Sequence, residues 1–368
     1  MCMQILVRLG DLFNAEKLIP IESAHISGVS YKTLGDAPIE FLKALADAEA
    51  RVQVRTTLNP QSLDDEYLSK RIPMKLCEKQ LEILEQFKKM GLTQSLTCTP
   101  YYLKRPESGS HLAWAESSAV VYSNSVLGAW TNREGGPSAL AAAVIGKTPE
   151  YGIHKTEGRQ SDVLVNVKAR LRNRTEYGAL GICLGKMLRD KIPAIRGLHA
   201  PTEEKLKQFS AALATTGMTN MFHIESPPMK SIEKVNVDDE DVEQTMAELS
   251  TTANEPDLVF IGCPHCSERE VKEIAQVIDH KKVRPEKQFW VCTSDHVKKR
   301  CADSVKRIEH SGGHVLAGVC TVVSWTEMLG IKTIMTNSAK TAHYAPTLNK
   351  AEAKLAPLKE CLKTAFKG

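Results

Sequence analysis

From about residue 160 onward the sequence alternates between strand-like and helix-like stretches, and this alternation limits the possible folds more than any other feature. Runs rich in β-branched and aromatic residues predict strands at residues 163–167, 221–224, 258–261, 289–292, 315–319 and 333–335. Amphipathic stretches between them predict helices, among them residues 202–216 and 267–280. Strands that alternate with helices are typical of parallel sheets. The sequence therefore predicts an α/β fold with largely parallel sheets flanked by helices.

The first 155 residues have a different texture, so we expect an N-terminal α/β region (1–155) and a C-terminal α/β region (156–368). The N-terminal part contains strand-like runs at 4–8 and 52–57 and helical patterns at 36–50 and 74–90. The last of these helices should bury Cys77, Leu81 and Leu84 at helical spacing. Residues 98–152 are rich in glycine, serine and asparagine, which favours a packed binding surface over a linker.

Composition excludes several classes of protein. The 48 Lys and Arg residues nearly balance the 44 Asp and Glu residues, and aromatic residues make up only 5%, so nucleic-acid binding is not indicated. No apolar run approaches the ~18–20 residues of a membrane span, and the apolar patch at the N-terminus is too short for a secretory signal. We expect a cytoplasmic protein without a membrane association, in which the ten cysteines are reduced thiols.

Chemically active residues follow several of the predicted strands. Cys98, Cys263, Cys320 and Lys340 each come just after a strand-like stretch, where a buried leucine would be the ordinary residue. Ligands of parallel sheets bind beyond the carboxyl ends of the strands. Three thiolates that leave one position open are the donor set of an iron–sulfur Lewis acid, although spacing alone does not prove one.

Other interpretations of these cysteines remain open at this point. A single cysteine at a strand end is more often a packed core residue than a ligand. The sequence Cys263-Pro-His-Cys266 is compatible with half of a zinc knuckle completed by Cys292 and Cys301, whose spacing is imperfect. It is also compatible with a redox pair. Arg133, in a Thr-Asn-Arg-Glu-Gly-Gly segment, fits either an anion contact or a solvent-exposed turn.

Taken in order, a set of motifs makes the chain resemble the aconitase X family, a divergent branch of the aconitase superfamily. The resemblance covers most of the chain. It rests on His-Ile-Ser-Gly-Val-Ser (25–30), Thr-Thr-Leu-Asn-Pro (56–60), Thr-Cys-Thr-Pro-Tyr (97–101), Glu-Ser-Ser-Ala (116–119), Thr-Asn-Arg-Glu-Gly-Gly (131–136), Gly-Cys-Pro-His (262–265), Cys320 and Thr-Asn-Ser-Ala-Lys (336–340).

The resemblance implies an aconitase-like multi-domain fold and an iron–sulfur-dependent hydro-lyase activity. Archaeal members of the family dehydrate (R)-5-phosphomevalonate to trans-anhydromevalonate 5-phosphate, in a modified mevalonate pathway for isoprenoid biosynthesis. Bacterial relatives dehydrate cis-3-hydroxy-L-proline, which is the alternative substrate here. Because the chain ends soon after Lys340, the resemblance favours the two-subunit type, in which a separate small swivelling-domain subunit completes a heterodimer and supplies a serine base.

The resemblance also implies roles for individual residues. A 4Fe-4S cluster would be held by Cys98, Cys263 and Cys320, the last two from the C-terminal region, whereas Cys266 lies outside the family pattern. Glu116 and Lys340 would be catalytic. Substrate contacts would come from Gly28, Val29, Ser30, Asn59, Pro60, Glu116, Ser117 and Lys340.

Two positions depart from the family pattern. Ala115 stands where glycine is expected before Glu116, and Trp130 stands where arginine is expected before Thr131. A lost arginine removes a possible anion contact, so a different hydroxy acid is a possible substrate. A rival of another class is a non-catalytic metal or redox protein that uses Cys263 and Cys266. The visible absorption of an iron–sulfur cluster distinguishes the enzyme from this rival.

Overall fold

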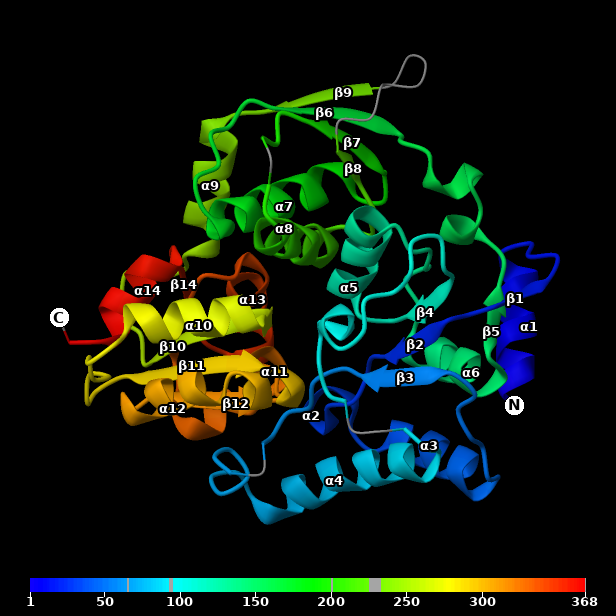
Figure 1. Ribbon diagram of the computed structural model, residues 1–368, viewed down its shortest axis with the longest axis horizontal. Coiled ribbons are helices and arrows are strands. Elements are labelled where there is room, and N and C mark those ends of the chain that lie inside the picture. Colours follow the sequence, from blue (N-terminus) through cyan, green and yellow to red (C-terminus); the bar gives the residue numbers. More distant parts are fainter. Residues whose placement is uncertain (65, 93–94, 200, 225–232, 368) are drawn as a thin grey trace.

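The computed structural model describes residues 1–64, 66–92, 95–199, 201–224 and 233–367. The described residues form three groups of strands and helices around a common centre, with the first group at the right of Figure 1, the second at the top and the third at the left. Within these ranges, no helix is long and apolar enough to cross a membrane.

The first group is built on a parallel sheet with strand order β3-β2-β4. Beside it, β1 pairs with β5 in an antiparallel manner. Helices α1, α3, α4 and α6 share one apolar core with this sheet. The elements are α1 (Cys2–Leu12), β1 (Leu18–Pro20), β2 (Ser23–Ile26), α2 (Tyr31–Leu34), α3 (Ala37–Asp47), β3 (Arg55–Leu58), α4 (Met74–Lys89), β4 (Leu112–Trp114), α5 (Ser117–Tyr122), α6 (Gly136–Ile145) and β5 (Lys147–Pro149).

The second group is a parallel sheet of order β8-β7-β6-β9 with two long helices packed closely together. The helices α7 and α8 approach closely because Gly181 of α7 faces α8: a Cβ atom at Gly181 would lie 2.7 Å from Ala212 Cβ. The elements are β6 (Val163–Val167), α7 (Arg174–Leu188), β7 (Pro193–Arg196), α8 (Glu203–Thr216), β8 (His223–Ile224), β9 (Glu233–Val237) and α9 (Asp239–Leu249).

The third group is a parallel sheet of order β12-β11-β10-β13-β14 that is covered on both faces. Helices α10, α12 and α14 pack on one face, and α13 packs on the other, where it also meets α7 and α8. The elements are β10 (Leu258–Cys266), α10 (Glu268–Val277), β11 (Gln288–Thr293), α11 (Asp295–Arg300), α12 (Ala302–His310), β12 (His314–Ala317), β13 (Thr333–Thr336), α13 (Ala339–Tyr344), β14 (Glu352–Leu355) and α14 (Leu358–Ala365).

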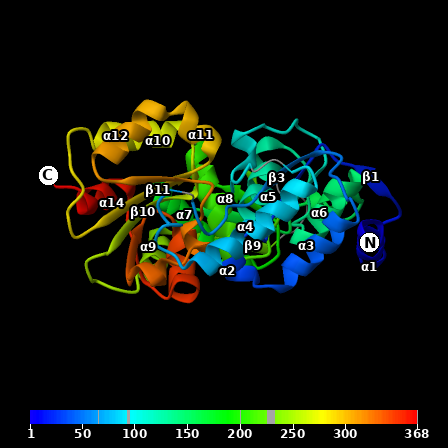
Figure 2. The same ribbon diagram turned by 90° about the horizontal axis from the view of Figure 1, so that it is seen from below.

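The first and third sheets direct their carboxyl ends toward the centre of the molecule. In Figure 1 the arrowheads of β3 and β11 point toward each other from the two sides. Figure 2, seen from below, places the first and third groups at opposite ends of the long axis. Residues that follow the strands of both sheets are therefore brought to one central place.

The predicted α/β class with parallel sheets is confirmed, and several elements match closely. The strand predicted at residues 163–167 is β6 (Val163–Val167). Ser267 and Glu270 form a capping box at the start of α10. The boundary predicted after residue 155 stays a prediction, and the three groups of strands occupy three successive stretches of the chain.

Two predictions in the first region were wrong. Residues 4–8 belong to α1 and not to a strand, because Cys2, Leu6 and Gly10 lie four residues apart and face the core together. Leu81 of α4 is 55% exposed. The neighbouring Gln80 takes the buried position instead, since its side chain donates to the Val29 carbonyl and accepts from Ser62 Oγ and Tyr31 N.

Candidate active site

A pocket between the first and third sheets collects all the residues that the sequence and the resemblance assigned to a site. We refer to it as the central pocket. The predicted residues that line it are Gly28, Val29, Ser30, Asn59, Pro60, Cys98, Glu116, Ser117, Cys263, Cys320 and Lys340. It is completed by Thr33, Ser118, Pro264, Val322, Val323, Tyr344 and Leu348, which the sequence analysis did not assign.

The three cysteines reach the central pocket from three separate segments. Cys98 follows the bridge of Leu96 to β3, Cys263 lies within β10, and Cys320 follows β12. Burial, together with the nearby Cys263, raises the pKa of the Cys320 thiol to about 12. Burial also raises the pKa of Cys98 well above its usual value, with added contributions from Glu116 and Cys263. Cys98, Cys263 and Cys320 are therefore close enough to interact electrostatically.

Three cysteine thiols are the donor type that holds an iron–sulfur cluster. Within the described ranges, no three His, Cys, Asp or Glu side chains are close enough to enclose one metal ion. In a cluster, by contrast, each thiolate binds a different iron atom, so the sulfur atoms need only surround a shared pocket. Binding to iron would deprotonate these thiols, since metal binding deprotonates a coordinating thiol. On this chemistry, Cys98, Cys263 and Cys320 fit an iron–sulfur cluster.

Cys266 lies on the other side of the sheet from Cys263. Cys263 packs in the same core cluster as Cys292, and Cys266 packs in a second cluster with Cys301. Cys266 does not line the central pocket. This separation disfavours both the zinc knuckle and the redox pair.

Glu116 and Lys340 form an ion pair in the central pocket. Glu116 is the N-cap of α5, just after β4, and Lys340 lies in the first turn of α13, just after β13. Lys340 Nζ lies 2.7 Å from Glu116 Oε1 and 3.5 Å from Ser117 Oγ. Ser118 Oγ donates to the same carboxylate oxygen at 2.8 Å. The pair joins the first sheet to the third.

Both members of this pair are charged at neutral pH. Burial acts to raise the pKa of Glu116, but the Lys340 charge and the hydrogen bonds from Lys340, Asn59 and Ser118 outweigh it and lower the pKa to about 2. Burial acts to lower the pKa of Lys340, but Glu116 outweighs it and raises the pKa. At neutral pH Glu116 is therefore an acceptor, and Lys340 carries the proton.

A buried histidine that the sequence analysis did not assign orients Asn59. His25 Nε2 lies 3.2 Å from Asn59 Oδ1, and His25 Nδ1 lies 2.7 Å from Thr57 Oγ1. Asn59 Nδ2 donates to Glu116 Oε2 at 2.9 Å. Burial lowers the pKa of His25 to about 4, so the ring is neutral at pH 7. Since Asn59 Oδ1 can only accept, Nε2 carries the proton.

The segment from Gly28 to Ser30 is tied to the cysteine segment of the third group. Gly28 adopts φ 78°, a conformation that favours glycine, as the chain leaves β2. Ser30 Oγ donates to the Val323 carbonyl at 3.0 Å, three residues after Cys320. This link places the backbone of residues 28–30 against the wall of the pocket that holds Cys320.

Arg133, Ala115 and Trp130 lie outside the residues that line the central pocket. The guanidinium of Arg133 donates to the carbonyls of Ala214 and Gly217 at the end of α8, at 3.1 Å each, so it packs against α8 and does not form an exposed turn. The Trp130 ring packs under Arg159, whose guanidinium carbon lies 4.4 Å from the ring centroid. The two departures from the family pattern therefore lie outside the lining of the central pocket.

Tyr344 is the lining residue that a sequence pattern could have indicated. It lies four residues after Lys340 in α13, so both side chains share one face of the helix. Thr33 and Leu348 carry no comparable signal, because their place in the pocket depends on the approach of segments far apart in the sequence.

Comparisons with known proteins agree along the whole chain. Residues 1–157 match the model of the aconitase X first domain, residues 161–247 the second domain, and residues 256–367 the third domain. A crystal structure of Thermococcus kodakaraensis aconitase X in its holo-form superposes with a TM-score of 0.92 at 39% identity, covering 99% of this chain and 94% of that one.

Curated relatives extend the comparison. The phosphomevalonate dehydratase large subunit of Methanocaldococcus jannaschii is 44% identical over 98% of this chain and 94% of its own length. The protein of the same name from Thermococcus kodakarensis is 42% identical over 93% of this chain and 89% of its own length. The cis-3-hydroxy-L-proline dehydratase of Pseudomonas aeruginosa is 33% identical over 100% of this chain and 67% of its own length. The chain belongs to the aconitase X family.

Proposed function

We propose that this chain is the large, cluster-binding subunit of a hydro-lyase that dehydrates (R)-5-phosphomevalonate to trans-anhydromevalonate 5-phosphate. The observation that carries the proposal is that three cysteines and the Glu116–Lys340 ion pair line one pocket. Relatives named phosphomevalonate dehydratase large subunit support the substrate, because they are more similar to this chain than the hydroxyproline dehydratases are.

Cys98, Cys263 and Cys320 would hold the 4Fe-4S cluster. When bound, it supplies a Lewis acid at an iron that has no cysteine ligand, which weakens the bond to the leaving hydroxyl. All three cysteines line the central pocket, so a substrate bound there would lie next to the cluster. The remaining chemistry belongs to protein side chains.

Glu116 and Lys340 would assist the protonation of the leaving hydroxyl. In dehydration a base removes the proton next to the carboxylate, the carbon–carbon double bond forms, and the hydroxyl leaves as water after gaining one proton. Glu116 is ionised in the ion pair and can accept a hydrogen bond from the substrate hydroxyl. Lys340 carries a proton at neutral pH and could deliver it to the departing oxygen or hold the substrate carboxylate. His25 would keep Asn59 turned toward Glu116.

The charge balance of the central pocket supports a shared active site. Phosphomevalonate carries a carboxylate at one end and a phosphate at the other. In the described part of the chain, Lys340 is the one cationic side chain that lines the pocket, and it already faces Glu116. Backbone amides of residues 28–30 could bind one anionic group. We infer that a small swivelling-domain subunit supplies further donors together with the serine base that removes the proton.

The cysteine assignment is tested by substitution. Anaerobically reconstituted protein should contain iron and labile sulfide, and Cys98→Ser, Cys263→Ser and Cys320→Ser should each lose most of both. Cys266→Ser and Cys77→Ser are matched controls, since both thiols are buried outside the central pocket, and they should retain the cluster. Retention in Cys98→Ser together with loss in Cys266→Ser would reject the assignment.

The substrate is tested with the reconstituted two-subunit complex. It should dehydrate (R)-5-phosphomevalonate and leave cis-3-hydroxy-L-proline unchanged, as followed by product analysis. Lys340→Ala should lower turnover by at least tenfold, because a lost hydrogen bond to a charged group costs about 1.5–3 kcal/mol. The exposed Lys359 provides the control, and Lys359→Ala should turn over like the parent. Turnover of hydroxyproline, with none of phosphomevalonate, would overturn the proposed substrate but leave the proposed dehydratase activity in place.

A further inference from the structure

His265 contacts all three segments that carry the proposed cluster ligands, although it does not line the central pocket. Its backbone N–H donates to Cys98 Sγ at 3.2 Å. Its ring Nε2 lies 2.8 Å from the carbonyl oxygen of Val319, the residue that precedes Cys320. His265 itself lies two residues after Cys263 in β10. One residue thus joins the chain at Cys98, Cys263 and Cys320.

The hydrogen bonds of the ring define its tautomer. The Val319 carbonyl can only accept, so Nε2 carries the proton. Nδ1 then accepts from the hydroxyl of Thr97, which lies 3.3 Å away and immediately precedes Cys98. Each ring nitrogen therefore makes a directed bond to a neighbour of a different cysteine, and His265 is completely buried with both nitrogens satisfied.

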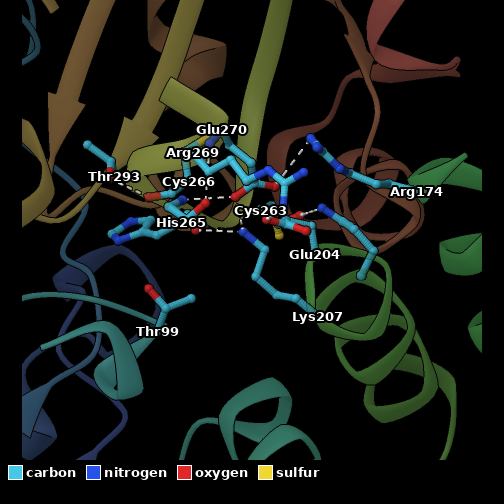
Figure 3. Close-up of polar contacts among 12 residues, drawn as sticks. Thr99, Arg174, Glu204, Lys207, Cys263, His265, Cys266, Arg269, Glu270 and Thr293 are labelled. Carbon is cyan, nitrogen blue, oxygen red and sulfur yellow. Dashed lines mark hydrogen bonds and ion pairs between the residues drawn. The ribbon is translucent and has the colours of Figure 1, made fainter. Parts of the chain in front are cut away.

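Helix α8 holds the main chain on the other side of His265, as Figure 3 shows around Lys207. Lys207 Nζ donates to the His265 carbonyl at 3.0 Å, and Gln208 Nε2 donates to the Cys263 carbonyl at 3.1 Å. These two consecutive residues of α8 therefore hold both ends of the Cys263–His265 segment of β10. Thr293 Oγ1 donates to the next carbonyl, that of Cys266, at 2.7 Å.

Lys207 is an unusual residue for this position, since only 1% of it is exposed. It is neutralised by a buried ion pair with Glu270, which also lies 3.8 Å from Arg174. Buried ion pairs often contribute little to stability compared with apolar residues of similar size, but they impose a defined geometry. Here the fixed geometry is that of the β10 segment that carries Cys263.

We propose that His265 is a positioning residue that sets the relative placement of Cys98, Cys263 and Cys320, with Lys207 and Gln208 of α8 holding its segment from behind. The inference rests on the proposed cluster and goes beyond it, because it assigns a role to residues that touch neither substrate nor iron. Residues that orient metal ligands typically contribute about 10–100-fold to metal affinity. The N–H bond to Cys98 sulfur also alters the electronic environment of a bound cluster.

The test compares iron release from reconstituted protein in the presence of a chelator and the electron paramagnetic resonance spectrum of the cluster. His265→Leu removes both ring bonds and should accelerate iron release about 10–100-fold with an altered spectrum. His265→Gln keeps an N–H group near the Nε2 position and should restore part of the retention. His154→Leu is the matched control, because His154 is also buried but lies outside the pocket, and it should release iron like the parent.

Gln208→Met provides a second variant that leaves no buried charge and keeps the fold testable if His265→Leu does not fold. It should also accelerate iron release. Parent-like release and spectrum in a folded His265→Leu, or in Gln208→Met, would overturn the inference, as would equally fast release in His154→Leu. A parent protein that takes up no cluster would instead overturn the proposed function, and this inference with it.

Discussion

At the scale of single residues, the central pocket depends on groups whose roles follow from their neighbours. Glu116 is an acceptor because Lys340, Asn59 and Ser118 all donate to it. His25 is neutral because it is buried, and it acts on Glu116 through Asn59. Sequence motifs indicated Glu116, Asn59 and Lys340, whereas the hydrogen bonds among them depend on contacts between residues more than 50 positions apart, such as Asn59 and Glu116.

The ion pair predicts a pH-dependent stability. The pKa of Glu116 is lowered from 4.5 to about 2 in the folded protein, so its stabilising contribution is complete above about pH 4.5 and is lost as the pH falls toward 2. Glu116→Gln should lower the free energy of unfolding by about 1.5–3 kcal/mol at pH 7, because Lys340 loses a charged partner. The difference from the parent should shrink between pH 4.5 and 2.

Urea unfolding of the cluster-free chain at several pH values measures this difference. Glu85→Gln is the control, because Glu85 is 52% exposed and pairs only with the exposed Lys88 among the described ion pairs. It should leave the free energy of unfolding unchanged at every pH. A constant difference between Glu116→Gln and the parent down to pH 2 would contradict the lowered pKa.

At the scale of elements, the sequence predicted what local patterns encode. The alternation after residue 160 indicated β6, β10, β11 and β13, and capping residues located the start of α10. Short strands such as β4 and β7 lack a local signal, because only pairing with neighbouring strands makes them extended. Residues 4–8 have a strand-like composition, but core packing of Leu6 with the rest of the first group favours a helix.

The contact between α7 and α8 predicts a sharp effect at Gly181. A Cβ atom there would lie 2.7 Å from both Ala212 Cβ and the Phe209 carbonyl oxygen, so Gly181→Ala must push the helices apart. We expect a loss of about 1–3 kcal/mol in the free energy of unfolding, despite the better helix propensity of alanine. Displacement of α8 should also accelerate iron release, because α8 carries Lys207 and Gln208.

Gly10 of α1 is the matched control, since its nearest neighbour would lie 3.5 Å from an added Cβ atom, an ordinary contact. Gly10→Ala should be neutral or stabilise by up to about 1 kcal/mol, in line with helix propensity. Chemical denaturation of both variants measures their free energies of unfolding. A Gly181→Ala protein as stable as Gly10→Ala would mean that the two helices separate at no cost.

At the scale of the whole molecule, the three groups contribute differently to the central pocket. The first contributes Asn59, Cys98 and Glu116 to the central pocket, and the third contributes Cys263, Cys320 and Lys340, among others. No described residue of the second group, 163–249, lines the pocket, yet α8 of this group holds the segment of β10 at His265. Such a division could not be predicted from the sequence, because it depends on how three separate sheets meet.

The mouth of the central pocket predicts where the small subunit binds. Leu348 lines the pocket and is 37% exposed, so a subunit that completes the active site should cover it. Leu348→Glu places a charge in that contact and should weaken the complex by at least tenfold, because desolvating an unpaired carboxylate is costly. Leu12 is 73% exposed on α1, at the far end of the first group in Figure 1, so Leu12→Glu should bind the partner like the parent.

Titration of the labelled small subunit measures both affinities, and activity should appear only on mixing. Equal affinities for the two variants would place the interface elsewhere, and full activity of the large subunit alone would remove the need for a partner.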